Sequence, residues 1–235
     1  MASNSSRERA QRTAELLKQQ QQQAKRRQAG IVGGIMAVLL IVAVGGGWFL
    51  LKSDSQPVKP KDSQYGLGVG DDNAPVHMII YEDFLCPACG YVESQTHEQL
   101  QAAADAGKVH LEYRPFNFLQ TDYSVQAANA FRAVWEQAGP EAAKKFHDSL
   151  YAEQPDEGGP FPDNDWFVEK AVAAGADEAT IRPAIENLDY QDWVDAATQD
   201  AASIRSTPTV FLDDKLLDEA MMGDVVQKML AAIPE

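Results

Sequence analysis

The chain contains only two cysteines, Cys86 and Cys89, and only two of its 235 residues separate them. A scaffold held together by disulfides would need more cysteines, spread along the sequence. The pair therefore has a local task. It can hold a disulfide, exchange a disulfide with other thiols, or supply half of a metal site.

The residues around the cysteine pair predict a strand followed by a helix. Residues 76–81 (VHMIIY) are short and mostly apolar, which is typical of a buried strand, and residues 86–106 repeat apolar side chains at helical spacing until Gly107. Residues 109–114 (VHLEYR) alternate and predict a second strand. A strand, a long helix and a second strand predict a right-handed parallel βαβ unit.

Cys86 is expected at the start of this helix, close to free backbone N–H groups and the positive end of the helix dipole, which favour a thiolate. Pro87 suits the first helical position because its missing N–H leaves no hydrogen bond unmade. Cys89 follows one turn later and is expected to be more buried. Cys86 is therefore predicted to be the exposed nucleophile and Cys89 the resolving thiol.

Two other uses of the cysteine pair are weaker. An inert disulfide across two residues closes too small a loop to stabilise the fold much. A structural zinc site normally needs four ligands, and the spacing of His97 and His110 from the cysteines matches no zinc finger. No metal and no cofactor are expected. All four histidines are predicted to be ordinary surface or strand residues: His77, His97, His110 and His147.

The rest of the body predicts a helical region and a late strand. Residues 121–205 carry apolar residues at helical spacing, and Pro183 is acceptable there only in the first turn of its helix. Residues 209–212 (TVFL) predict a strand directly after Pro208, and residues 221–233 predict a final helix.

An apolar segment near the N-terminus, residues 31–51, contains no charged residue. As a helix it would span about 31 Å, close to the hydrocarbon thickness of a bilayer. A cleaved signal peptide would have a shorter apolar region and a clear cleavage site, so a retained anchor is predicted. Lys25, Arg26 and Arg27 precede the segment and place residues 1–30 in the cytoplasm and the body outside.

Charge is unevenly distributed along the chain. Residues 1–30 carry a net charge of +5 and the remaining residues one of −20, which together give the net charge of −15. The acidic body argues against nucleic acid as a partner, because phosphate binding needs clustered Lys and Arg. Residues 52–72 are rich in Ser, Pro, Gly and Asp and predict a linker to a body that begins near Asn73.

A second motif accompanies Cys86-Pro87-Ala88-Cys89: Ser206-Thr207-Pro208-Thr209 directly precedes the late strand. On these two motifs, residues 73–235 resemble the thioredoxin superfamily, specifically its DsbA-like branch. The resemblance implies that Cys86 and Cys89 form a catalytic, redox-active disulfide. It also implies that Pro208 is cis and faces this disulfide. Substrate is then expected to bind to Thr207, Pro208, Pro87 and Ala88.

The fold class that follows is α/β, a thioredoxin-like fold with an inserted helical domain, preceded by one transmembrane helix. The expected divisions are a cytoplasmic tail (1–30), the transmembrane helix (31–51), the linker (52–72), the first part of the thioredoxin-like domain (73–120), the helical insertion (121–194) and the second part of the domain (195–235).

The resemblance also implies a function. The chain is expected to be a single-pass protein of the cell membrane that introduces disulfides into secreted or cell-surface proteins. A membrane partner, DsbB-like or VKOR-like, would reoxidise it. A reductase or isomerase, including one that serves cytochrome maturation, is the alternative. A further class is an anchored protein that binds through a thioredoxin-like groove without catalysis.

Three positions depart from the best-known members of the resembled family. Ala88 replaces a His, which removes a hydrogen-bond donor beside Cys86 and favours a less oxidising disulfide. Ile80 stands where many relatives carry an acidic residue, and alternation places only one of the nearby Glu82 and Asp83 toward the core. Thr207 replaces a Val, which leaves the direction of catalysis open.

Overall fold

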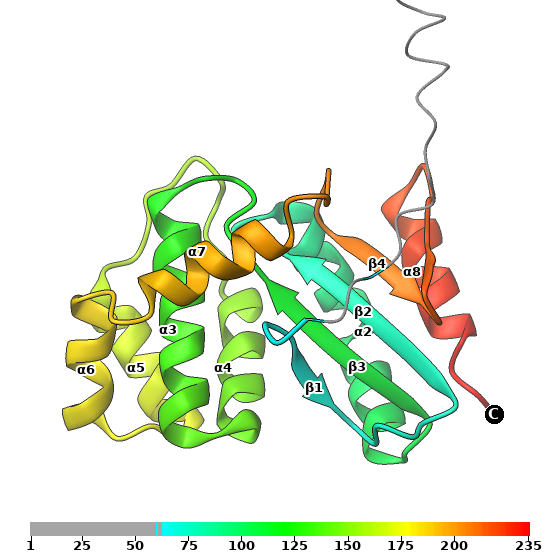
Figure 1. The fold of residues 1–235 in the computed structure, drawn as a ribbon, viewed down its shortest axis with the longest axis horizontal. Coiled ribbons are helices and arrows are strands. Elements are labelled where there is room, and N and C mark those ends of the chain that lie inside the picture. Colours follow the sequence, from blue (N-terminus) through cyan, green and yellow to red (C-terminus); the bar gives the residue numbers. More distant parts are fainter. Residues whose placement is uncertain (1–59, 61–62) are drawn as a thin grey trace, which may run out of the picture. The chain divides into compact units, whose positions relative to one another are not determined.

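The computed structural model describes residue 60 and residues 63–235 (Figure 1). Its strands are β1 (Leu67–Val69), β2 (Val76–Glu82), β3 (Val109–Pro115), β4 (Thr209–Leu212) and β5 (Lys215–Leu216). Its helices are α2 (Pro87–Asp105), α3 (Asp122–Ala138), α4 (Pro140–Ala152), α5 (Asn164–Ala174), α6 (Glu178–Glu186), α7 (Gln191–Asp200) and α8 (Met222–Ala231). The predicted tail and transmembrane segment lie outside these residues. Among the described helices, none has both the length and the apolar character needed to cross a bilayer.

The five described strands form one mixed sheet in the order β1-β3-β2-β4-β5. β2 and β3 are parallel and α2 connects them, so the predicted βαβ unit is confirmed. β4 lies antiparallel on the other side of β2, with Val210 opposite Ile80. Asp213 and Asp214 both have positive φ, which makes the tight turn that joins β4 to β5.

The central strand β2 has one buried face, and its other face is buried at the end that leads to Cys86. Met78 and Ile80 point into the main core together with residues of α2 and α8. Tyr81 points to the opposite face, where it packs with Phe116 and Phe211. Residues 78–81 are buried or half-buried on both sides and are all apolar or aromatic, as a strand covered on both sides requires.

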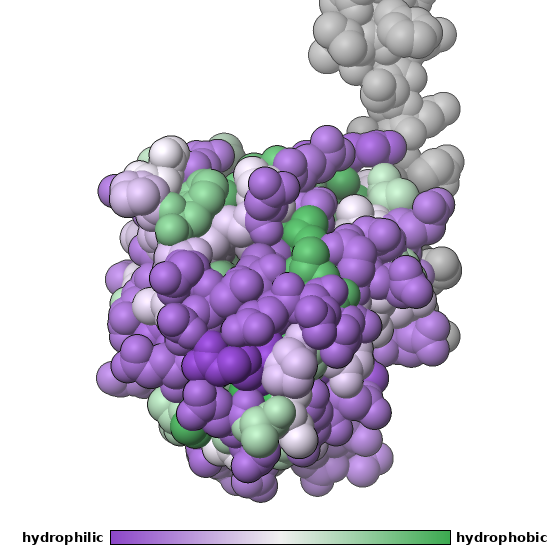
Figure 2. All heavy atoms as spheres, turned by 90° about the vertical axis from the view of Figure 1, so that its left-hand side faces the viewer, coloured by the Kyte–Doolittle hydropathy of each residue, from purple (hydrophilic) through white to green (hydrophobic). Residues whose placement is uncertain are grey.

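The helical insertion lies beside the sheet, with α3, α4, α5 and α6 packed on one another (Figure 1). Its buried stripe includes Phe131 and Val134 on α3 and Phe146 and Leu150 on α4, as helical spacing predicted. The face on the side of α5 and α6 is mostly hydrophilic and carries only small separate hydrophobic patches (Figure 2).

Three predicted features of the fold are wrong in detail. Leu67, inside the predicted linker, is buried in β1, which pairs with β3; three residues between glycines are too short for a strand pattern to appear. The predicted boundary between the helical insertion and the second part of the domain, at residues 194 and 195, falls inside α7.

Pro183 was expected in the first turn of its helix, but it lies in the second turn of α6. Proline has no N–H, so the helix loses one backbone hydrogen bond at this position. The helix persists because its side chains Ile181, Ala184 and Ile185 are buried in the core.

Candidate active site

The structure places Cys86 at the N-cap of α2 and Pro87 at its first position, as the sequence predicted. The backbone N–H of Cys86 donates to the carbonyl oxygen of Asp83 at 2.9 Å. The Cys86 thiol donates to the carbonyl oxygen of Thr207 at 3.2 Å. Because the Thr207 loop lies against it, Cys86 is only 6% exposed, and the expectation of an exposed sulfur was wrong. Cys89 is 1% exposed.

The two thiols have opposite electrostatic environments. A hydrogen bond from the Cys89 side chain, which outweighs the effect of burial, lowers the pKa of Cys86 to about 6. The backbone N–H groups of Cys89 and Ala88 add smaller stabilisation of the thiolate. Burial, and then the neighbouring Cys86, raises the pKa of Cys89 well above the ordinary thiol value. Near neutral pH the pair therefore consists of one thiolate and one thiol.

The Thr207-Pro208 motif lies next to the cysteine motif in the structure. The Thr207–Pro208 peptide bond is cis, as the resemblance implied. Pro208 is buried and Thr207 is half-buried, and the Thr207 hydroxyl oxygen has no hydrogen-bond partner among the described residues. Pro87 is exposed and Ala88 is half-buried, so three of the four predicted substrate-binding residues are at least partly accessible.

Gln154, just after α4, is a contact that the sequence did not reveal. Its side-chain nitrogen donates to the carbonyl oxygen of Phe84 at 2.9 Å and to that of Cys86 at 3.0 Å. This amide therefore ties the helical insertion to the loop that carries the cysteine. No local pattern marks a glutamine that lies 68 residues from its partner.

Asp83 is completely buried, and it organises the loop before Cys86. Its carboxylate accepts hydrogen bonds from three backbone N–H groups and one hydroxyl: those of Leu85, Phe118 and Leu119, and that of Ser124. Burial raises the pKa of Asp83, and these hydrogen bonds oppose the rise. Alternation predicted that only one of Glu82 and Asp83 is buried, but β2 ends at Glu82 and alternation ends with it.

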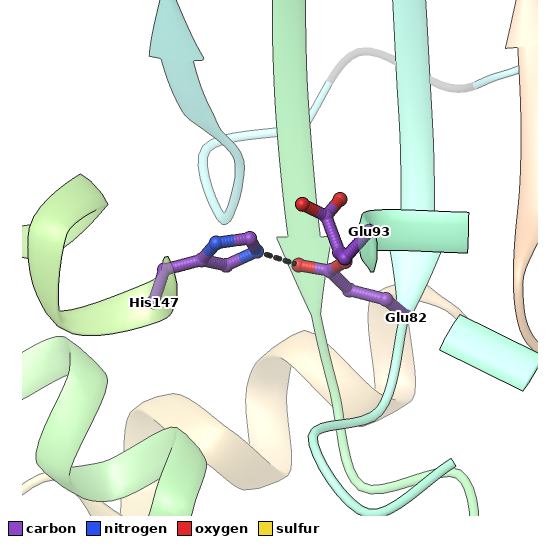
Figure 3. Close-up of side chains that lie close together, drawn as sticks. All are labelled: Glu82, Glu93 and His147. Carbon is purple, nitrogen blue, oxygen red and sulfur yellow. Dashed lines mark hydrogen bonds and ion pairs between the residues drawn. The ribbon is translucent and has the colours of Figure 1, made fainter. Parts of the chain in front are cut away.

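Three buried titratable side chains from β2, α2 and α4 converge (Figure 3), and the charge of one of them, Glu82, helps to raise the pKa of Cys89. Glu82 accepts a hydrogen bond from Nε2 of His147 at 2.7 Å, and Glu93 lies beside both. Burial alone would lower the pKa of His147, but the charge of Glu82 and hydrogen bonds to Asp148 and Glu82 raise it to about 9. Burial raises the pKa of Glu93 to about 7.

The prediction that His147 is an ordinary surface or strand residue was wrong. His147 is completely buried in α4, because the carboxylate of Glu82 and that of Asp148 satisfy its two ring nitrogens. The spacing of Cys89 and Glu93, four residues apart on one helix face, is the sequence signal that could have placed Glu93 near the site.

Comparison with known proteins decides the family. The family model described as Thioredoxin matches residues 62–232, which is most of the chain. The chain belongs to the thioredoxin family. Disulfide bond formation protein D of Bacillus subtilis (strain 168) is 27% identical over 175 residues, which cover 69% of this chain and 74% of that protein.

Solved structures agree with this membership. Oxidised DsbA of Mycobacterium tuberculosis shares 28% identity and a TM-score of 0.60, covering 72% of this chain and 93% of that one. Oxidised BdbD of Bacillus subtilis has a TM-score of 0.64 at 23% identity. The match covers 74% of this chain and 98% of that one, and it supports the fold. This thioredoxin-family chain is a DsbA-like thiol–disulfide oxidoreductase.

Proposed function

We propose that this oxidoreductase introduces disulfides into secreted or cell-surface proteins, with Cys86 as nucleophile and Cys89 as resolving thiol. The observation that carries the proposal is the lowered pKa of Cys86, about 6, beside a Cys89 thiol whose pKa is raised. A stabilised thiolate favours the reduced form of the enzyme, and a couple whose reduced form is stable is an oxidant. The name of the Bacillus subtilis relative, Disulfide bond formation protein D, agrees with this direction.

The reaction passes two electrons from the substrate to the enzyme. A substrate thiolate attacks Sγ of Cys86, a substrate–Cys86 disulfide forms, and the Cys86–Cys89 bond breaks, with Cys89 leaving as a thiolate that takes up a proton. A second substrate thiolate then attacks the substrate sulfur of this mixed disulfide. The substrate disulfide forms, and Cys86 leaves as a thiolate that its surroundings stabilise.

We assign substrate recognition to Pro87 and Ala88, which follow Cys86 in the chain, and to Thr207 and Pro208, whose loop contacts it. An extended segment of substrate would pair with the backbone of Thr207 beside Pro208, while Pro87 and Ala88 contact it from the start of α2. The distance of 3.2 Å between the Cys86 sulfur and the Thr207 carbonyl oxygen supports this arrangement, because a substrate held there lies at the reacting sulfur.

The proposed location is the outer face of the cell membrane, with residues 31–51 as a single anchor and residues 1–30 in the cytoplasm. Disulfides persist outside the reducing cytosol, which suits the proposed reaction. A membrane protein that is DsbB-like or VKOR-like would accept the two electrons and restore the disulfide. In a cysteine-free chain, single reporter cysteines before residue 25 and after residue 60 test the orientation. A membrane-impermeant reagent should label only the second in intact cells.

The reduction potential of the Cys86–Cys89 couple tests the direction of catalysis. Equilibration of the full chain with glutathione buffers should give a potential clearly above that of thioredoxin, about −270 mV. A value at or below it would assign the chain to reduction instead. The same oxidised chain should transfer its disulfide to a reduced dithiol protein in stoichiometric amount, and Cys86→Ser should abolish the transfer.

A further inference from the structure

We propose that Glu93, His97 and Asp148 form a binding site for a divalent transition-metal cation, in a cleft between α2 and α4. One ligand atom from each of these side chains lies within 4.8 Å of the others. The site contains neither cysteine, and it is independent of the proposed oxidase function.

Two of the three ligands come from one face of α2. Glu93 and His97 are four residues apart, a spacing that places their side chains one above the other on a helix. Asp148 faces them from α4, with an oxygen 3.6 Å from Nδ1 of His97. In a tetrahedral site, ligand atoms about 2 Å from the metal lie about 3.4 Å apart, so small side-chain rotations would close the site.

Buried polar atoms without partners point to a missing ligand. Glu93 is only 4% exposed, and its Oε1 atom has no hydrogen-bond partner among the described residues. The Nδ1 atom of His97 is also buried and makes no hydrogen bond there. Leaving such atoms unsatisfied is costly, and a bound cation would satisfy both at once.

The cleft supplies an entry path and room for water. It has a volume of about 700 Å³, and Glu93, His97 and Asp148 line it together with other mainly polar residues. An open position next to three protein ligands is typical of sites in which water completes the coordination. One imidazole and two carboxylates favour Zn²⁺ and similar transition-metal ions over Ca²⁺ or Mg²⁺, which prefer oxygen ligands alone.

The neighbouring trio of Glu82, Glu93 and His147 (Figure 3) is a weaker candidate. Glu82 and His147 already satisfy each other with a hydrogen bond of 2.7 Å, and all three side chains are buried. His147 also contacts the proposed site, because its Nδ1 lies 3.0 Å from Oδ1 of Asp148. Such contacts orient a metal-ligating carboxylate. The pKa of His147, about 9, leaves the ring positively charged near neutral pH, and this charge opposes cation binding.

Lys144 also contacts Asp148, and its positive charge opposes cation binding. A carboxylate has two oxygens and several lone pairs, so Asp148 can accept these hydrogen bonds and still coordinate a metal. The charge of Lys144 predicts moderate affinity, and Lys144→Met should strengthen binding.

Zinc titration of the full chain in its oxidised state tests the proposal, because the disulfide removes both thiols as competing ligands. Competition with a chromogenic chelator should show one Zn²⁺ bound per chain. His97→Ala and Glu93→Gln should each weaken binding at least about tenfold. His110→Ala, which removes a histidine that lines a different cleft, should leave the affinity unchanged.

Circular dichroism should show that His97→Ala is folded, since His97 is partly exposed. Binding that survives His97→Ala, or that His110→Ala removes, would overturn the proposal. Cobalt(II) gives a second readout. The oxidised chain should show visible bands of nitrogen and oxygen coordination, and a thiolate-to-cobalt charge-transfer band would contradict the assigned ligands.

Discussion

The different reactivity of the two thiols comes from the direction of the hydrogen bond between them. Cys89 donates to Cys86, which stabilises the Cys86 thiolate and at the same time holds Cys89 in its protonated form. A position at the start of α2 adds backbone donors to Cys86 alone. The sequence predicted this asymmetry from Pro87 and the helix start, but it did not reveal that the larger contribution is the thiol one turn later.

Substitution of Cys89 separates these contributions. Cys89→Ser keeps a hydrogen-bond donor beside Cys86, whereas Cys89→Ala removes it. The pKa of Cys86, followed by the ultraviolet absorbance of the thiolate against pH, should therefore be higher in Cys89→Ala than in Cys89→Ser. Both should stay below the free-thiol value of about 8.5 because the helix start remains. Equal pKa values in the two variants would show that the Cys89 donor is unimportant.

The lowered pKa of Cys86 also makes the stability of the reduced protein depend on pH. Between about pH 6 and pH 8.5 the unfolded thiol binds a proton that the folded thiolate does not, so stability rises with pH. The gain is present above the unfolded pKa and is lost as pH falls through 6. Urea unfolding should show that reduced wild type gains up to about 3 kcal/mol over reduced Cys86→Ser across this window. A constant difference would contradict the lowered pKa.

At the scale of elements, the long patterns of the sequence predicted the structure and the short ones did not. α2, β2, β3 and the helices of the insertion follow apolar repeats of six residues or more. β1 has only three residues and takes its structure from pairing with β3, a contact between residues 42 to 46 positions apart. Such a strand carries too little local information to be separated from a linker.

Gly70 fixes the end of β1, so its substitution tests that strand. It has a φ of +95°, and a Cβ there would lie 2.5 Å from the carbonyl oxygen of Val109 in the backbone of β3. Gly70→Ala should cost about 2–4 kcal/mol of unfolding free energy, from strain and from the clash with backbone. Gly107→Ala is the control, because Gly107 also has a positive φ but nothing within 4 Å. Gly107→Ala should lose less unfolding free energy, because it adds only the backbone strain of a positive φ and no clash.

The link between α4 and the cysteine loop is testable at Gln154. Gln154→Ala removes two hydrogen bonds to the carbonyl groups of Phe84 and Cys86 and should lower the unfolding free energy by about 1–3 kcal/mol. Gln126→Ala, which removes one hydrogen bond to Ile185, is the matched control and should cost about half as much. Similar losses in both would show that the second bond of Gln154 adds no stability.

At the scale of the whole molecule, the helical insertion is part of the candidate site. α4 contributes His147 against Glu82, and the segment after it contributes Gln154 against the loop of Cys86. The motifs around Cys86 and Pro208 could be predicted from the sequence because each is local. The buried cluster could not, because it joins residues 65 positions apart that carry no local pattern.

Trapping of mixed disulfides tests the central claim, that Cys86 exchanges disulfides with substrates and Cys89 resolves them. In Cys89→Ser the reactive sulfur remains, but the thiol that releases the enzyme from a mixed disulfide is lost. This variant should accumulate covalent complexes with many cysteine-containing secreted proteins, visible on non-reducing gels and dissolved by reductant. Cys86→Ser keeps only Cys89, whose raised pKa holds it as a thiol, and should trap few. More complexes with Cys86→Ser than with Cys89→Ser would contradict the assignment of the two cysteines.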